Sequence, residues 1–167
     1  VYINQRSQND VGPFTLAEPG TYFLFLEGNQ PGISNYSFRL LDVASQPVLD
    51  LNVDQNGSLN PGNSVGIFKF TGTDQQRLFF DGKGSDNGGT ANLYGPGNEA
   101  ITSANLINDF EVTLTRNGEY ILVLDGASPN PVPYSFRLST AKTITNALTL
   151  GTLVTGTLAE PGEEDWY

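Results

Sequence analysis

The chain has 167 residues, a formal net charge of −10 and a pI near 4.1. This acidic balance argues against nucleic acids as partners, since they need clustered Lys and Arg side chains, and against anionic membrane surfaces. Cys and His are absent, which excludes disulfides and Ser-His or Cys-His catalysis. No apolar run approaches the roughly 20 residues of a membrane helix, so we expect no membrane insertion.

The pentapeptide Tyr-Ser-Phe-Arg-Leu occurs twice, at residues 36–40 and 134–138, which are 98 positions apart. The match extends back to Thr15 and Thr113 without a gap, and about half of the positions are identical. A fixed period of this kind indicates a tandem repeat. The repeat predicts three parts: residues 1–40 as the second half of a preceding repeat, 41–140 as a complete repeat, and 141–167 as the opening strands of a following one.

In chain order, residues 13–16 and 21–27 are predicted strands joined by a Pro-Gly turn. The run 22–26 is apolar at every position, and so is its counterpart 120–124. A strand with two apolar faces is usually covered on both sides. One interpretation is a central strand partly covered by a loop. The other is that its outer face packs on a neighbouring repeat or subunit, through Phe23, Phe25, Ile121 and Val123.

The repeated pentapeptide alternates clearly, with its aromatic residues and its Leu on one face and its Ser and Arg on the other. Arg39 and Arg137 are therefore expected on the solvent face. If the two strands of each half-repeat pair, these arginines would form weak surface ion pairs with Glu27 and Asp125. A ligand-binding arginine is the alternative.

The remaining predicted strands cover residues 67–72, 76–81, 91–94 and 109–114, with a loop at 82–90. No window shows helical periodicity. Many short strands separated by Gly and Pro predict an all-β fold, an antiparallel β-sandwich of the jelly-roll kind.

The repeat boundaries leave three hypotheses for the partial repeats. The chain is a window on a longer tandem array, or the partial repeats associate within or between chains, or the ends are disordered remnants. We expect the first, followed closely by the second, because half the strands of a sandwich cannot bury its core.

The ordered motifs Gly-x-Leu-x-Pro-Gly, Phe-Thr-Gly, Arg-Leu-Phe-Phe-Asp, Leu-Tyr-Gly-Pro-Gly and Gly-x-Tyr-x-Leu-x-Leu-Asp-Gly resemble the bacterial pre-peptidase C-terminal domain family. The resemblance is greatest to its tandem versions in large secreted proteins, including cyanobacterial ones. It implies a non-catalytic β-sandwich at the bacterial cell surface or outside the cell. Its implied uses are adhesion, substrate binding or support of secretion.

Calcium is the one cofactor that the resemblance suggests, since some relatives bind it near the acidic start of the domain. The matching residues here are Glu163, Glu164 and Asp165, although the equivalent stretch 63–66 of the complete repeat has no carboxylate. Asp81 and Asp86, in an Asn- and Gly-rich loop, offer further oxygen ligands. That loop lacks the regular spacing of an EF-hand, so a plain turn is the preferred interpretation.

Two functional classes follow. The first is a non-catalytic structural repeat that assembles with itself into an array or filament, for example by strand complementation. The second is an accessory module that binds polysaccharide or a protein of the cell surface through exposed aromatic residues such as Tyr94 or Trp166. The residues expected to take part in assembly are Phe23, Phe25, Ile121, Val123, Trp166 and Tyr167.

Overall fold

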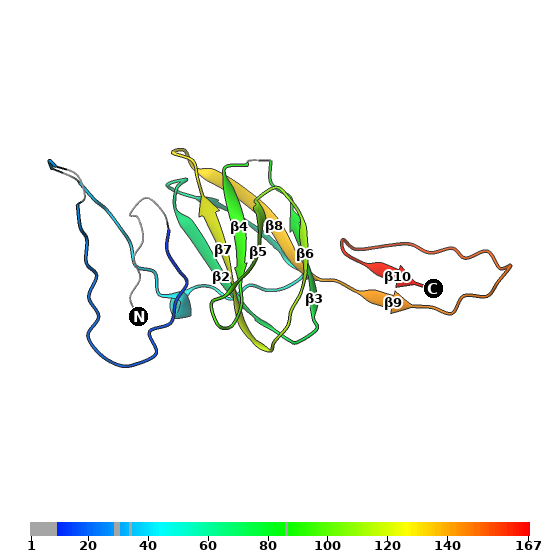
Figure 1. Cartoon of the computed structure of the whole chain (residues 1–167). Helices are drawn as coiled ribbons and strands as arrows, with labels where there is room; N and C mark the ends of the chain where they lie inside the picture. Colours follow the sequence, from blue (N-terminus) through cyan, green and yellow to red (C-terminus); the bar gives the residue numbers. More distant parts are fainter. Residues whose placement is uncertain (1–9, 29–30, 34, 86) are drawn as a thin grey trace.

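A computed structural model describes residues 10–28, 31–33, 35–85 and 87–167. Two antiparallel sheets of four strands pack face to face in the middle of the chain (Figure 1). One sheet has the order β1-β8-β3-β6 and the other β2-β7-β4-β5. The predicted all-β sandwich is confirmed. Its strands are β1 (Asp54–Leu59), β2 (Val65–Gly72), β3 (Arg77–Gly82), β4 (Gly89–Tyr94), β5 (Ala100–Asn105), β6 (Phe110–Thr113), β7 (Gly118–Gly126) and β8 (Val132–Thr140).

Alternation along the strands builds the core between the sheets. In β4 every second residue is buried, so one face of the strand lies in the core and the other is partly exposed to solvent. Phe80 is fully buried and its ring stacks on Phe110 and Phe136, with centroids 4.8 and 5.2 Å away. The buried cluster comprises Leu49, Leu59, Phe70, Leu78, Phe80, Ala91, Leu93, Leu106, Leu114, Tyr120, Leu122, Leu124, Val132, Phe136 and Leu138.

The two strands that carry the repeated motifs do not pair with each other. β7 lies between β2 and β4, whereas β8 lies between β1 and β3 in the opposite sheet. The connection 127–131 therefore crosses from one sheet to the other instead of forming a hairpin. The expected ion pair between Arg137 and Asp125 is wrong for this reason, and Arg137 Nε instead donates to Asp54 Oδ1 at 2.6 Å.

The flanking parts lie outside the sandwich, on opposite sides of it (Figure 1). Among the described residues of 10–41 no strand forms, so the strands expected at 13–16, 21–27 and 36–40 are wrong as local structure. The reason is that β7 and β8 obtain their partners from β1 to β4, and this half-repeat contributes no such strands. A short 3₁₀ turn, η1 (Val43–Ser45), leads into the sandwich.

Beyond the sandwich, β9 (Thr143–Thr145) and β10 (Glu164–Trp166) pair in parallel. Only Ala141 and Lys142 connect β8 to β9, and both are bonded: Ala141 N donates to Arg77 O, and Glu164 N donates to Lys142 O, each at 2.9 Å. Within the described part of the chain, no helix has the length and apolar character needed to cross a membrane.

Candidate interaction surfaces

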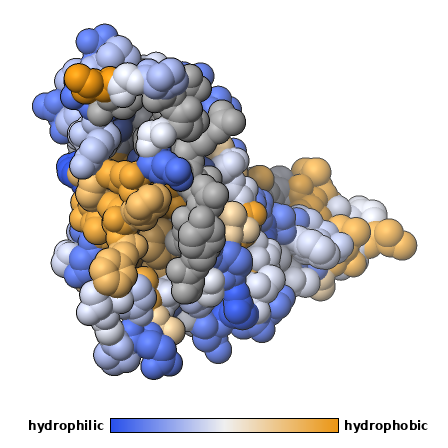
Figure 2. Space-filling view, turned by 60° about the vertical axis from the view of Figure 1, so that its left-hand side comes forward, coloured by the Kyte–Doolittle hydropathy of each residue, from blue (hydrophilic) through white to orange (hydrophobic). Residues whose placement is uncertain are grey.

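Residues 10–40, the N-terminal half-repeat, expose the side chains that form the core of the complete repeat. Leu24 is 57% exposed, whereas its counterpart Leu122 is fully buried. Phe38 is 54% exposed, whereas Phe136 is 1% exposed. Figure 2, in which this side of the molecule comes forward, shows hydrophobic side chains gathered there. We call this set the N-terminal apolar face; its members are Tyr22, Leu24, Leu26, Phe38 and Leu40.

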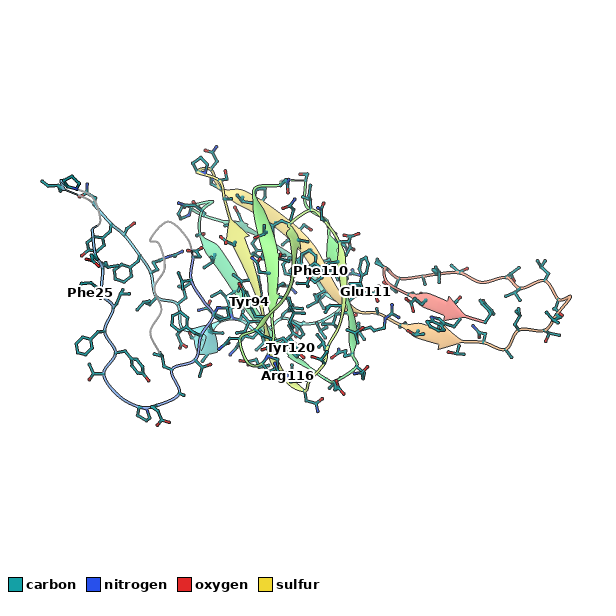
Figure 3. All side chains as sticks on the ribbon, in the orientation of Figure 1. Phe25, Tyr94, Phe110, Glu111, Arg116 and Tyr120 are labelled. Carbon is teal, nitrogen blue, oxygen red and sulfur yellow. The ribbon has the colours of Figure 1, made fainter. Side chains whose placement is uncertain are left out.

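The half-repeat keeps one local feature of the complete repeat. In the complete repeat the Tyr120 hydroxyl donates to Arg116 O at 2.7 Å, as in the tyrosine corners of other β-sandwiches. The Tyr22 hydroxyl donates in the same way to Glu18 O, also four residues upstream. Tyr120 and Arg116 lie near one end of the sandwich (Figure 3). The turn that precedes the apolar run is therefore already formed.

The outer face of the run differs between the two copies. Phe23 is 91% exposed and Phe25, on the outer arm of the half-repeat (Figure 3), is also exposed. Ile121, the counterpart of Phe23, is buried in a hollow that Pro13 and Phe14 of the half-repeat also line, and Val123, the counterpart of Phe25, is half-buried. At the same place Asn98 Nδ2 donates to Thr15 Oγ1 at 2.9 Å. The half-repeat thus contacts the outer face of the β2-β7-β4-β5 sheet; a role of these residues in assembly stays a prediction.

A carboxyl pair lies at the same contact. Burial raises the pKa of Asp125, and the neighbouring Asp10 carboxylate raises it further. The folded state therefore favours the protonated form. Protonated Asp125 therefore contributes to the free energy of unfolding. This contribution is complete below the ordinary pKa of 3.8 and is lost as the pH rises through the raised pKa of Asp125.

We expect Asp125→Asn to raise the melting temperature at pH 7 and to flatten its dependence on pH above 4, because an amide stays neutral throughout. Melting curves between pH 4 and 7 measure the effect, and the exposed Asp50→Asn serves as the matched control. Equal pH profiles for wild type and Asp125→Asn would contradict the assignment.

Residues 141–167 extend into a long loop and return to the sandwich, and we call them the C-terminal hairpin although β9 and β10 run parallel. They correspond to the start of the complete repeat. The parallel ladder of the hairpin joins Thr143 to Glu164, which are 21 positions apart. In the complete repeat a parallel bridge joins Val48 to Lys69, also 21 positions apart. The same lead-in segment therefore pairs with the same strand in both copies. Much of the hairpin's apolar surface is open: Leu150, Leu153, Leu158, Trp166 and Tyr167 are all exposed.

Arg77, at the start of β3, holds the hairpin to the sandwich. Its guanidinium pairs with Glu111 of β6 and, at 2.8 Å, with Glu164 of β10. It also donates to Thr143 Oγ1 of β9. Glu111 lies on the side of the sandwich next to the hairpin (Figure 3). Arg77 could not be found through the repeat, because the partial repeats contain no counterpart of it. The inward alternation of Leu78 and Phe80 was the available signal, since it places Arg77 outward.

A second arginine reinforces this contact. Arg137 Nη1 lies 3.8 Å from Glu160 Oε2, in the turn before β10. The same arginine also donates to Asp54 within the sandwich, and hydrogen bonds from Lys83 and Arg137 lower the pKa of Asp54. Gly162 lies so close to the outer face that a Cβ there would be 2.8 Å from Phe79 Cβ. The hairpin therefore contacts the outer face of the β1-β8-β3-β6 sheet, opposite to the face that the half-repeat contacts.

We expect Arg77→Ala to release the hairpin while lowering the global free energy of unfolding by no more than about 1 kcal/mol, because partly exposed ion pairs contribute little. Hydrogen exchange at the amides of β10 should become faster, and exchange in the core strands should not change. Arg116→Ala, which removes the ion pair with Glu99 elsewhere on the sandwich, is the control. Unchanged exchange in β10 would show that Arg77 does not hold the hairpin.

The structure does not bring the predicted calcium ligands together. Glu163 Oε2 accepts from Ala159 N at 2.7 Å and from Glu160 N at 3.1 Å, which makes it a turn cap. Glu164 accepts from Arg77 and from Trp166 Nε1, and strand alternation directs Asp165 to the opposite face. Asp81 pairs with Lys83 at 3.7 Å. Asp86 lies outside the described residues. Among the described residues, no three carboxylates form a group suited to a metal ion.

The sequence matches no protein-family model and no curated protein. Similar solved structures exist. The inhibitor of g-type lysozyme from Aeromonas hydrophila is 21% identical, has a TM-score of 0.48, and is covered over 93% of its length by 56% of this chain. The corresponding inhibitor from Salmonella Typhimurium is 19% identical, with a TM-score of 0.44, and the match covers 98% of it and 57% of this chain.

A pre-peptidase C-terminal domain, from the collagenase of Bacillus anthracis, is also similar. It is 18% identical, has a TM-score of 0.47, and is covered over 95% of its length by 57% of this chain. A member of the family that the sequence motifs resemble is therefore among the solved structures that are similar to this chain. The three matches cover 56–57% of the chain.

Proposed function

We propose that the chain is a non-catalytic β-sandwich repeat of a bacterial extracellular or cell-surface protein, and that it acts in structural assembly. One observation carries the proposal. The two partial repeats contact opposite outer faces of the complete sandwich, while the faces equivalent to its core stay open. A sandwich with a contact on each outer face is suited to stacking with others of its kind into an array or filament.

The exposed apolar surface of the two partial repeats favours association with another chain over function as a monomer. Monomeric proteins rarely expose large contiguous apolar patches, and such patches usually mark interaction sites. Here the exposed residues include Phe23, Phe25, Phe38 and Leu40 at one end, and Leu150 and Leu153 at the other. Because the two surfaces differ, contact between them is heterologous and generates open chains or rings.

Light scattering and electron microscopy of the chain over a range of concentrations test this proposal. Oligomers that grow with concentration are expected, and a monomer at every concentration would overturn it. Repeating the measurement with a calcium chelator tests the calcium hypothesis separately, since only calcium-dependent assembly supports a metal at the acidic turn.

A second candidate is a module that binds polysaccharide or another protein. The observation that favours it is the exposed indole of Trp166, which is fixed by a hydrogen bond to Glu164 at 2.9 Å. Tyr94, the other aromatic residue considered, is half-buried. Trp166→Ala should abolish retention on a polysaccharide matrix if this candidate is right, and unchanged retention would contradict it.

A further inference from the structure

We infer that the N-terminal apolar face is the docking site for residues 153–167 of a second copy of the chain. The docked strands take the register that joins β1 to β8 and β2 to β7 inside the complete repeat. This inference rests on the proposed assembly function and specifies its partner and geometry. The complete repeat is itself the template, because it contains both halves of the interface in contact.

The register follows from two offsets. The N-terminal half-repeat lies 98 positions before its counterpart, and Gly57 and Gly156 place the C-terminal hairpin 99 positions after its own. The Pro-Gly pairs 61–62 and 161–162 are 100 positions apart, so the hairpin has one extra residue before this pair and one fewer after it. In the complete repeat Gly57 lies opposite Tyr134, and Phe68 opposite Leu122. Between copies, this places Gly156 opposite Tyr36 and Tyr167 opposite Leu24.

The residues at these positions keep the chemistry of the template. A Cβ at Gly57 would lie 2.4 Å from the Tyr134 hydroxyl oxygen, so the end of the tyrosine ring lies directly over a residue that has no side chain. The corresponding pair between copies is Gly156 and Tyr36, which preserves both members. The Tyr36 ring is largely exposed in the single chain.

An aromatic cluster is preserved as well. In the complete repeat Phe68 makes edge contacts with Tyr134 and Phe136, at centroid distances of 6.2 and 5.6 Å. Its counterpart is the half-exposed Tyr167, and the counterparts of the other two rings are Tyr36 and Phe38. Three aromatic side chains that are exposed in the single chain would thus pack together, with Phe38 buried as Phe136 is.

The docking is apolar in character. The ion pair between Asp54 and Arg137 has no equivalent, because Leu153 occupies the position of Asp54. Residues 10–40 contain three carboxylates and one arginine, and residues 141–167 contain four carboxylates and one lysine. Two acidic segments repel at low ionic strength, so added salt should strengthen the contact.

One chain cannot make this contact with itself. The half-repeat and the hairpin lie on opposite sides, with the whole sandwich between them (Figure 1). Each chain therefore offers a docking face at one end and docking strands at the other, and copies join head to tail.

Disulfide trapping tests the register, since the chain contains no cysteine. Asn56 and Ser135 are partners across β1 and β8, so the equivalent pair between copies is Thr155 and Ser37. Chains carrying Ser37→Cys and Thr155→Cys are mixed and oxidised mildly. We expect a disulfide-linked heterodimer. The double variant Asn56→Cys/Ser135→Cys is the positive control for the geometry within one chain.

Thr149→Cys mixed with Ser37→Cys controls for random collision, because six residues of extended chain displace the thiol by about 20 Å. Trapping with Thr155→Cys should exceed this control by about fivefold or more, since a disulfide forms only between nearby Cα atoms. Leu24→Asp in the Ser37→Cys chain should abolish the trapping. Thr21→Asp should not, because its counterpart in the complete repeat is the exposed and acidic Glu119.

Equal trapping with Thr149→Cys and Thr155→Cys would overturn the register. If the unmodified chain still forms oligomers in that case, assembly stands and only the docking geometry is wrong. If light scattering shows monomers at every concentration, the proposed function and this inference fail together.

Discussion

Phe136→Ala is expected to lower the free energy of unfolding by about 3–5 kcal/mol, because it removes a fully packed aromatic side chain and leaves a cavity. Phe136 is almost completely buried, between Phe80 and Phe68. Phe38→Ala changes the same residue of the same pentapeptide, but this ring is more than half exposed in the single chain. We expect it to change the free energy of unfolding by less than about 0.5 kcal/mol.

Urea unfolding followed by far-UV circular dichroism, at protein concentrations that keep the chain monomeric, measures both effects. The identical local sequence makes the two substitutions controls for each other, since intrinsic strand propensity cancels. Similar losses at both positions would show that the half-repeat is packed within the single chain. A loss at Phe38 that appears only at high concentration would instead support docking between copies.

Gly126→Ala is expected to lower the free energy of unfolding by about 3 kcal/mol, because the added Cβ forces the backbone to move. A Cβ at this position would lie 1.9 Å from the carbonyl oxygen of Gly62, which no side-chain rotation can relieve. Gly126 N also donates to Ser64 O at 3.1 Å, so retreat of the strand would break a backbone hydrogen bond. The glycine is needed because two chain segments cross closely at this edge of the sandwich.

Gly28 is the counterpart of Gly126 in the half-repeat, and a Cβ there meets no atom within 4 Å. Gly28→Ala should therefore leave the monomer's thermal unfolding unchanged. Differential scanning calorimetry of the two variants makes the comparison. If Gly126→Ala unfolds like the wild type, the close crossing at Gly62 is not a constraint on the fold.

Much of the fold could be predicted from the sequence because its information is local. The alternation of Tyr134, Phe136 and Leu138, and the Gly and Pro punctuation, are sufficient to predict short strands in an antiparallel sandwich. The sheet to which each strand belongs depends on contacts between residues far apart in the sequence. The local sequence pattern does not show that β7 and β8 lie in opposite sheets. The partners of Arg137 were predicted wrongly for that reason.

The N-terminal half-repeat also shows that strand formation depends on residues far away in the sequence. Residues 36–40 have the sequence of a strand, yet no strand forms there, because strand formation depends on partners that lie elsewhere. The interaction surfaces were therefore predictable as a set of apolar residues, through the repeat. Their attachment to the two outer faces, through Arg77 and Asn98, depends on tertiary contacts and could not be predicted.

The two-residue connection between β8 and β9 has a mechanical consequence. Both of its residues are hydrogen-bonded to their surroundings, and the arginine contacts lie directly beside it. In the assembly that we propose, this connection would restrict rotation of each sandwich relative to the docked strands. A series of sandwiches would then form a stiff rod whose end-to-end length grows in proportion to their number.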